Sequence, residues 1–274
     1  MDLNVISHGH AKAEEDHRRE LCIAGRWLRD RGFVVATEGN VSVRLDSGRI
    51  LVSPRSRSKG ALLPHTIVVA DIESREFARD SEATTEIGMH LLIYRMRPDV
   101  NAVVHAHPPT ACGFAAAHAP LDKALLAEMV VSLGAVPVAP YGTPGTPELA
   151  EALEPFVPHH DAILLANHGA VTCGRDLLTA FYKMELVEQY ARVALVTQIL
   201  GKQSLLSGSD VEKLLAARGR YGVSQPGEPG LTGVVPIQTS SDDADGEEPE
   251  RITMTRPELE ALIEEALRND RARR

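Results

Sequence analysis

The chain has 274 residues, enough for one large domain or two small ones with a sizeable core. Hydrophobic residues make up 43% of the sequence and charged residues 24%, a globular composition that excludes a disordered or fibrous protein. The formal net charge is −9, and aromatic residues make up only 4%. We therefore expect no nucleic-acid partner, because binding a phosphate backbone relies on a basic excess and base stacking relies on aromatic rings.

The three cysteines lie far apart and show no C-x-x-C spacing: Cys22, Cys112 and Cys173. This usage is typical of a reducing, intracellular compartment rather than of a disulfide scaffold. The first residues contain no basic segment followed by an apolar run, and no stretch approaches the roughly 20 apolar residues of a membrane span. We expect a soluble, cytoplasmic protein that does not associate with membranes.

The N-terminal part of the chain predicts helices and short strands. An amphipathic helix is predicted over residues 11–32, where apolar residues recur at helical spacing until Gly32. Asp46-Ser47-Gly48 has the composition of a tight turn between two strands of a hairpin. The elements predicted before Pro98 are strands over 40–45, 49–53 and 66–71 and a helix over 84–96.

Two apolar runs in the middle of the chain, 102–107 and 162–171, are bounded by Pro, Gly or Asp, as short buried strands often are. Both runs contain histidines. The remaining predicted elements are helices over 124–133 and 146–156, a short strand over 136–139, a long helix over 176–200 and a short helix over 210–218.

The composition changes after Tyr221. Proline and glycine, followed by a run of acidic residues, predict a flexible linker over 223–253. Thr255-x-x-Glu258 is a capping box, and apolar residues along one face predict a short amphipathic helix over 254–274. We therefore expect one folded domain over 1–222 and a short helix on a tether.

The strongest local signal for chemistry is His105-Ala106-His107. Side chains two apart on a strand face the same side, so both imidazoles can reach one divalent ion. His168 closes a strand predicted over 163–167 within the second apolar run, just before Gly169, where the backbone leaves the sheet. Three neutral imidazoles with an open fourth position are a known zinc arrangement with Lewis-acid activity. The residues alone also fit core histidines satisfied by backbone carbonyls.

Surface or packing roles are expected for the other histidines, which occupy polar or helical surroundings: His8, His10, His17, His65, His90, His118, His159 and His160.

A candidate anion site lies at the start of the helix predicted over 84–96. The hydroxyls of Thr84 and Thr85 lead into a first turn that holds Glu86, and free N–H groups there can bind a phosphate. The same residues also fit a plain helix cap. Gly39-Asn40 likewise fits either a binding turn or the start of a strand that needs an unusual backbone angle.

Taken in order, these motifs resemble the class II aldolase and adducin head-domain family, which includes fuculose phosphate aldolases and ribulose phosphate 4-epimerases. The resemblance covers roughly residues 10–222. The matching motifs are Gly39-Asn40-Val41-Ser42-Val43-Arg44, Thr84-Thr85-Glu86, Arg97-Pro98-Asp99, Ala102-Val103-Val104-His105-Ala106-His107, Ala139-Pro140-Tyr141-Gly142-Thr143 and Ala166-Asn167-His168-Gly169.

The resemblance implies an α/β fold of three layers, in which helices flank a central, largely antiparallel β-sheet. It also implies a homotetramer whose active sites lie between subunits, and a divalent metal, usually zinc. By the same resemblance, the metal ligands are His105, His107, His168 and Glu86. Glu86 also exchanges protons with the substrate, and Tyr221 reaches a neighbouring subunit's site. The positions implied to bind phosphate are Gly39, Asn40, Thr84 and Thr85.

Two departures from the family pattern bear on the substrate. Fuculose phosphate aldolases carry a Thr-Gly pair in the loop after the second strand, where this chain has Arg55 and Ser56, followed by Arg57 and Lys59. Three cations in five positions suggest either a tighter phosphate grip or a substrate with an added carboxylate, although a solvated loop also fits. A second catalytic tyrosine of those aldolases is missing, since its region reads Leu125-Leu126-Ala127-Glu128.

The expected activity is therefore metal-dependent cleavage of a ketose 1-phosphate to dihydroxyacetone phosphate and an aldehyde. Epimerases, dehydratases and decarboxylases of sugar phosphates share the scaffold and stay open, as does a non-catalytic adducin-like module. The terminal helix resembles the peptides that deliver enzymes to bacterial microcompartment shells. Docking of this helix on its own domain fits as well.

Overall fold

The computed structural model describes residues 13–73, 82–221, 238 and 239. Of the predicted linker and terminal helix, only Gln238 and Thr239 fall within this part of the chain. The described strands form a seven-stranded sheet in the order β3-β2-β1-β4-β7-β6-β5. Their bounds are β1 (Asn40–Arg44), β2 (Arg49–Val52), β3 (Val68–Asp71), β4 (Ala102–Ala106), β5 (Val138–Ala139), β6 (Ala162–Leu165) and β7 (Gly169–Gly174).

The pairing is antiparallel throughout except between the last two strands of the order, β5 and β6. In the centre, β4 pairs with β1 on one side, where His105 lies opposite Asn40, and with β7 on the other, where His105 lies opposite Val171. The sheet therefore places the first residue of β1 beside a predicted metal ligand.

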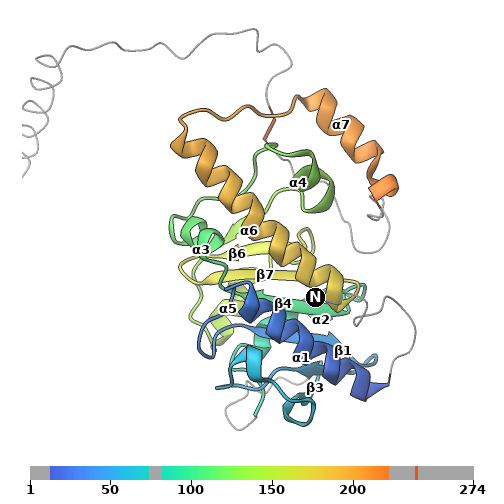
Figure 1. Cartoon of the computed structure of the whole chain (residues 1–274). Helices are drawn as coiled ribbons and strands as arrows, with labels where there is room; N and C mark the ends of the chain where they lie inside the picture. The colour runs from blue at the N-terminus through green and yellow to red at the C-terminus, as the bar shows by residue number, and fades with distance from the viewer. Residues whose placement is uncertain (1–12, 74–81, 222–237, 240–274) are drawn as a thin grey trace, which may run out of the picture. The chain divides into compact units, whose positions relative to one another are not determined.

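Alternation along the strands produces two hydrophobic clusters, one on each face of the sheet. Ala102 and Val104 of β4 pack with residues of α1, α3 and α6, whereas Val103 packs with residues of α2 and α5. In Figure 1, α1 and α6 cross the front of the sheet. Helices thus cover both faces, and the predicted fold of three layers with a largely antiparallel sheet is confirmed.

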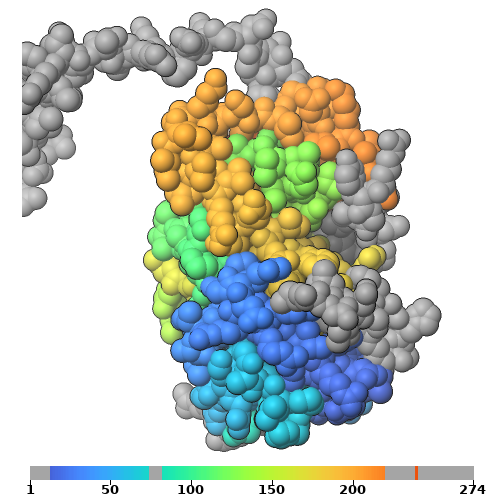
Figure 2. All heavy atoms as spheres, in the orientation of Figure 1, coloured from blue at the N-terminus to red at the C-terminus, as the bar shows by residue number. Residues whose placement is uncertain are grey.

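The helices of the described part are α1 (Glu14–Asp30), α2 (Ile87–Met96), α3 (Pro109–Ala116), α4 (Ala127–Ser132), α5 (Pro147–Leu153), α6 (Leu177–Ile199) and α7 (Gly208–Ala216). Short 3₁₀ turns span η2 (Lys59–Ala61), η3 (Pro64–Thr66) and η4 (Arg218–Tyr221). Figure 2 shows α1 in blue and the end of α6 beside α7 in yellow-orange and orange on the same face of the molecule. The end of α6 exposes Ile199 and Leu200, whose side chains have nothing apolar to cover them within the described residues.

Three predictions of local structure were wrong. The apolar run 162–171 is not one strand, because Asn167 adopts φ 54° and turns the chain between β6 and β7. Helix α3 directly follows His107-Pro108 and was not predicted. Glu86 does not lie in the first turn of a helix over 84–96, because α2 begins at Ile87 and Glu86 is its N-cap.

All three cysteines are free in the structure, as their spacing predicted. No helix among the described residues combines the length and hydropathy that crossing a membrane requires.

Candidate metal centre

Three imidazoles converge where β4 ends and the chain turns from β6 to β7. His105 is the fourth residue of β4, His107 follows the strand directly, and His168 lies in the turn before β7. The ring centroids are 5.0 Å apart for His105 and His107, 4.8 Å for His105 and His168, and 5.0 Å for His107 and His168. Within the described residues these three side chains form a group whose ligand atoms all lie within 4.8 Å of one another. Such a nearly equilateral triangle is the arrangement that three ligands of one ion adopt.

Hydrogen bonds on the far side of two rings select the nitrogen that faces the group. Nδ1 of His105 donates to the carbonyl oxygen of Ala170 at 2.9 Å, so Nε2 is the nitrogen that faces the group. Nδ1 of His107 lies 3.4 Å from a carboxylate oxygen of Glu38, which again leaves Nε2 for the centre. The two Nε2 atoms are 3.2 Å apart.

Glu86 completes the group from the start of α2. Its Oε2 lies 3.3 Å from Nε2 of His105, and its Oε1 lies 3.1 Å from Nε2 of His168. With metal–ligand distances of about 2.0–2.1 Å, two ligand atoms of a tetrahedral zinc lie about 3.3–3.4 Å apart. The contacts of each Glu86 oxygen with one imidazole, and the 3.2 Å between His105 and His107, are therefore close to the edge length of a tetrahedral site.

Two buried polar atoms of this group have no hydrogen-bond partner among the described residues: Oε1 of Glu86 and Nδ1 of His168. An unpaired carboxylate oxygen in a buried place is costly unless a cation or a proton donor faces it. The donor set of three imidazoles and one carboxylate, together with this orphaned oxygen, fits a divalent metal ion.

The local backbone explains why the histidines come so close. Gly169 has no side chain, and a Cβ atom there would lie 2.7 Å from the carbonyl oxygen of Ala106. Gly39, with φ 67°, plays the same part on the other side of β4, because its Cβ would lie 2.8 Å from the carbonyl oxygen of His105. Both glycines therefore let a neighbouring chain approach the strand that carries the ligands.

Burial and charge set the protonation of the group. Burial, followed by the charges of His105 and His168, lowers the pKa of His107 to about 3, so its ring is neutral and can act as a ligand. Burial alone would raise the pKa of Glu86, but the adjacent imidazoles of His105 and His168 outweigh it and hold that pKa below its ordinary value. Burial would lower the pKa of His105, and the Glu86 carboxylate more than offsets this. Glu86 is therefore ionised at neutral pH.

The residues predicted to bind phosphate come from three segments that the structure brings together. Ser53, after β2, donates its main-chain N–H to the carbonyl oxygen of Val41 at 2.9 Å and accepts from the N–H of Thr84 at 3.2 Å. Main-chain N–H of Arg55 donates to the carbonyl oxygen of Glu82 at 3.0 Å. The start of β1, the loop after β2 and the segment before α2 thus form one wall beside Glu86.

Within this wall the side chains differ in what they can offer a ligand. The two amide hydrogens of Asn40 are directed at Glu86 Oε2, 2.7 Å away, and at the hydroxyl of Thr84, 3.1 Å away. Thr84 is buried, whereas Thr85 and Ser56 are exposed. Ser56 has φ 54°, a left-handed conformation that is uncommon for a residue with a side chain. The side chain of Asn40 is thus already committed, and the exposed hydroxyls and main-chain N–H groups remain for an anion.

The loop after β2 offers fewer cations than its sequence suggested. Lys59 is 1% exposed, and its ammonium group donates to the carbonyl oxygens of Thr37 at 2.9 Å and Arg57 at 2.7 Å. Burial lowers its pKa to about 8, against the attraction of Glu86. The prediction of three ligand-facing cations was therefore wrong, because Lys59 ties the loop to the residues before β1. Arg55, which is partly exposed, and Arg57, which is exposed, remain as candidates.

Tyr221 is the last residue of η4, and its side chain lies outside the described part of the chain. η4 lies near α4, because the side-chain Nε of Arg218 donates to the carbonyl oxygen of Val131 at 2.7 Å. Its expected role at a neighbouring subunit's site therefore stays a prediction. Leu125 and Leu126, at the position of the missing tyrosine, immediately precede α4.

Sequence analysis missed one residue of the site. His90 on α2 is fully buried, so a surface role is wrong, and its ring bonds to Asn40 and Ser42 instead of packing against apolar atoms. A signal was present in the spacing: Asn40 and Ser42 are two apart on a strand, and Glu86 and His90 are four apart near a helix, so each pair lies on one face.

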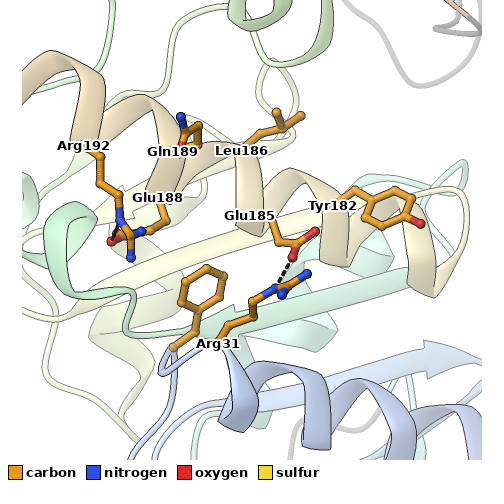
Figure 3. Close-up of a pocket in the computed structure, with 8 residues that line it drawn as sticks. Arg31, Tyr182, Glu185, Leu186, Glu188, Gln189 and Arg192 are labelled. Carbon is orange, nitrogen blue, oxygen red and sulfur yellow. Dashed lines mark hydrogen bonds and ion pairs between the residues drawn. The ribbon is translucent and has the colours of Figure 1, made fainter. Parts of the chain in front are cut away.

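A hollow of about 520 Å³ lies elsewhere, between the end of α1 and the middle of α6. Figure 3 shows its lining, with the ion pair between Arg31 and Glu185 across it. No predicted metal ligand or phosphate-binding residue lines it. Its wall includes the buried Glu188, whose carboxylate accepts hydrogen bonds from the main-chain N–H groups of Thr110 and Ala111 and so caps α3, the helix that follows His107. Glu188 in the wall of this hollow therefore stabilises the start of the helix that follows His107.

The comparisons with known proteins agree with this geometry. The profile of the class II aldolase and adducin N-terminal domain matches residues 19–195. The chain belongs to this family.

Its relatives carry out more than one reaction. A 3-oxo-tetronate 4-phosphate decarboxylase of Haemophilus influenzae is 34% identical over 190 residues, which cover 66% of this chain and 88% of the relative. An L-fuculose phosphate aldolase of Methanococcus maripaludis is 38% identical over 173 residues, which cover 61% of this chain and 90% of the relative. A solved structure of L-fuculose 1-phosphate aldolase superposes with a TM-score of 0.69 at 29% identity, covering 78% of this chain and all of that one. Members of the family thus act on phosphorylated sugars and are lyases, and the reaction of this chain is not decided by similarity.

Proposed function

We propose that this chain is a divalent-metal-dependent lyase that cleaves a ketose 1-phosphate to dihydroxyacetone phosphate and an aldehyde. The observation that carries the proposal is the placement of an ionised Glu86, whose Oε1 accepts no hydrogen bond in the described part of the chain, within 3.1–3.3 Å of two of three converging imidazoles. A non-catalytic module has no physical need for a buried carboxylate whose oxygen lacks a partner. The geometry therefore favours catalysis over a binding or assembly role.

His105, His107, His168 and Glu86 would hold the metal, and we expect zinc because imidazole nitrogen and carboxylate oxygen are its common ligands. When bound, such an ion supplies Lewis-acid stabilisation of the negative charge that develops beside a carbonyl when the carbon–carbon bond breaks. Glu86 is the residue of this group that can move a proton. Its Oε1 lies 3.1 Å from Nε2 of His168 but accepts no hydrogen bond within the described residues, so it can accept a proton from a substrate atom and later deliver it to carbon.

The phosphate end of the substrate would lie against the wall formed by three segments beside Glu86. Gly39, Ser56 and Thr85 would bring main-chain N–H groups and exposed hydroxyls to the phosphate, and Arg55 a positive charge. Thr84, whose N–H and hydroxyl are bonded to Ser53 and Asn40, would hold the wall together. Held there, the phosphate fixes the distance between the reacting carbon and Glu86, so remote binding energy contributes to the rate.

Decarboxylation of a phosphorylated 3-oxo sugar acid is a second candidate, and the loop after β2 favours it. Arg55 and Arg57 can recognise a carboxylate, and loss of carbon dioxide needs no hydroxyl to serve an aldehyde oxygen, which agrees with the missing tyrosine at Leu125-Leu126. A decarboxylase is also among the relatives. Both reactions leave the same kind of electron-rich carbon for Glu86 to protonate.

One assay separates the two candidates. The zinc-loaded protein is incubated with a panel of ketose 1-phosphates and of 3-oxo-tetronate 4-phosphates, and the release of dihydroxyacetone phosphate and of carbon dioxide is measured in parallel. Dihydroxyacetone phosphate from a ketose 1-phosphate alone supports the aldolase. Decarboxylation of a 3-oxo-tetronate 4-phosphate also leaves dihydroxyacetone phosphate, so carbon dioxide is the product that distinguishes the two reactions. Release of both products from that acid and of neither from a ketose 1-phosphate, with Arg55→Ala raising KM about tenfold or more, supports the decarboxylase. Release of neither product from any compound rejects both.

We further propose a homotetramer in which Tyr221 serves a neighbouring subunit, residues 1–222 as the catalytic domain, and residues 254–274 as a separate helix that engages a microcompartment shell. The exposed apolar end of α6, with Val196, Ile199 and Leu200, supports association of subunits. Light scattering of the purified protein tests the tetramer, and a mass of one or two subunits rejects it.

A further inference from the structure

A buried row of five polar side chains leads away from the metal centre between β1 and α2. Its hydrogen bonds connect Glu86 to Asn40 at 2.7 Å, Asn40 to His90 at 2.5 Å, His90 to Ser42 at 2.7 Å and Ser42 to Tyr94 at 2.9 Å. Asn40, Ser42, His90 and Tyr94 are 2% exposed or less. The row therefore lies out of water along its whole length beyond Glu86.

The row forms because the spacing of alternate residues along β1 is close to the spacing of every fourth residue along α2. Asn40 and Ser42 are two apart on a strand, which corresponds to about 6.8 Å, and His90 and Tyr94 are four apart on a helix, which corresponds to about 6 Å. Glu86 is four residues before His90. Strand and helix run in the same direction here, so each strand side chain lies between two side chains of the helix.

The hydrogen bonds have one consistent direction. If Nε2 of His90 carries the proton, it donates to Oδ1 of Asn40, and Nδ1 accepts from the hydroxyl of Ser42, which in turn accepts from Tyr94. With Oδ1 of Asn40 occupied in this way, only the NH₂ group can face Glu86. The other tautomer would place an N–H against Ser42 and leave Oδ1 of Asn40 without its donor.

The surroundings of His90 keep its ring neutral. Burial, followed by the charge of His105, lowers its pKa to about 3. A neutral ring has one donor and one acceptor, as this row requires. The row thus has a fixed polarity at neutral pH.

This polarity distinguishes the two oxygens of Glu86. Oε2 receives the amide hydrogen of Asn40, whereas Oε1 has no hydrogen-bond partner in the described part of the chain. Without His90, the side-chain amide of Asn40 could rotate and turn its oxygen toward Glu86. The amide oxygen and the carboxylate would then repel each other. Glu86 would then lose the contact that holds its orientation.

We propose that His90 is a positioning residue: through Asn40 it anchors Oε2 of Glu86 and reserves Oε1 for proton transfer. This inference rests on the proposed function, in which Glu86 moves the proton. His90 touches neither the substrate nor the metal ligands and acts only through the orientation of one amide.

The row can be observed without turnover. In zinc-loaded protein labelled with ¹⁵N in histidine and asparagine, NMR should show His90 as the neutral Nε2–H tautomer between pH 6 and about pH 9. The side-chain NH₂ signals of Asn40 should be split by the strong bond to a carboxylate. They should remain so in His90→Gln, whose terminal amide nitrogen can replace Nε2, and collapse in His90→Leu. An Nδ1–H tautomer, or Asn40 signals that do not change in His90→Leu, would overturn the inference.

The kinetic arm uses the same two variants. His90→Leu should lower kcat by about 10–100-fold, leave KM within about threefold and keep the full zinc content, whereas His90→Gln should restore most of kcat. Equal losses in His90→Gln and His90→Leu would overturn the positioning role.

Met89→Ala is the matched control for structural damage, since Met89 is the preceding residue of α2, is equally buried and takes no part in the row. It should lower the melting temperature at least as much as His90→Leu and leave kcat unchanged. If kcat fell in proportion to the melting temperature in both His90→Leu and Met89→Ala, His90 would have only a packing role. If the wild-type protein releases no product from any substrate, the proposed function fails, and the NMR experiment still decides whether the row has the inferred polarity.

Discussion

Gly169 and His107 are in contact so close that no other residue fits at position 169. A Cβ atom built there would lie 2.6 Å from Cδ2 of the His107 ring. The turn that carries His168 therefore packs directly on the ring of a second predicted ligand. The distance between two ligands that are far apart in sequence is thus set by the absence of one side chain.

Gly169→Ala should weaken zinc binding by about 10–100-fold, because the methyl group must displace the ring of His107 from the other two imidazoles. Competition with a chromophoric chelator measures the affinity. Gly113→Ala is the control: it lies on α3 with no atom within 4 Å of the added Cβ, and alanine should stabilise that helix by up to about 1 kcal/mol. Wild-type affinity in Gly169→Ala would show that the contact does not position His107.

His105→Ala and Glu86→Gln should separate metal binding from proton transfer. His105 is a fully buried member of the triangle, so His105→Ala should abolish both zinc binding and turnover. Glu86→Gln keeps an oxygen that can accept from Asn40 and should retain most of the zinc, while kcat falls by about 10²–10⁴-fold. Elemental analysis and steady-state kinetics on the same samples test both statements. Full activity in Glu86→Gln would exclude it as the group that moves the proton.

Buried ion pairs away from the site should govern acid stability. Asp161 lies 2.9 Å from Nη2 of Arg97 and 2.6 Å from Nζ of Lys183. Burial would raise the pKa of Asp161, but Lys183 and Arg97 outweigh it and lower that pKa. Because the pKa is lower in the folded than in the unfolded state, the carboxylate stabilises the fold above about pH 4 and this contribution is lost as the pH falls further.

Asp161→Asn should therefore cost about 3–5 kcal/mol of unfolding free energy at pH 7, since Lys183 loses its carboxylate partner and Arg97 keeps only Asp99. The difference from wild type should shrink below about pH 4. Urea unfolding at several pH values measures it. Asp210→Asn, which removes an exposed partner of Lys213, is the control and should not change the curve. An Asp161→Asn difference that stays constant down to pH 2 would contradict the assignment.

The sequence predicted those parts of the fold in which local pattern and tertiary structure agree. Alternation around Asp46-Ser47-Gly48 predicted the hairpin of β1 and β2, and the apolar run with His105 and His107 predicted β4 nearly to the residue. The sequence indicated that the chain leaves the sheet next to Gly169, but not that β7 begins at that residue. The left-handed conformation of Asn167 makes the turn tight enough for the chain to reverse there.

For the site, the sequence indicated which residues take part but not the contacts that their side chains make. The three histidines and Glu86 were expected from their motifs, and the structure brings them together. The direction of a side chain is a tertiary property, so the burial of Lys59 and the amide contacts of Asn40 were not predictable from residue type. His90 was missed because a polar residue on an apolar helix is ambiguous until the strand that faces it is known.

Two C-terminal truncations should distinguish the effect of residues 240–274 from the effect of the contacts that Gln238 makes. Gln238 accepts from the main-chain N–H of Ala124 at 2.7 Å, and its side-chain amide donates to Asp122 at 2.9 Å. The neighbouring Lys123 accepts a hydrogen bond from the hydroxyl of Tyr190 on α6, so Gln238 borders on a segment that is tied to the core.

Deleting residues 240–274 should leave the melting temperature, oligomeric state and kcat unchanged, because the contacts of Gln238 remain. Deleting residues 225–274 removes them and should lower the melting temperature by about 2–8 °C, since each lost hydrogen bond contributes about 1 kcal/mol, again without a change in kcat. Calorimetry, light scattering and steady-state kinetics on both truncations measure these effects. A loss of kcat or of subunits in the shorter deletion would show that the terminal helix belongs to the catalytic assembly and is not a separate element.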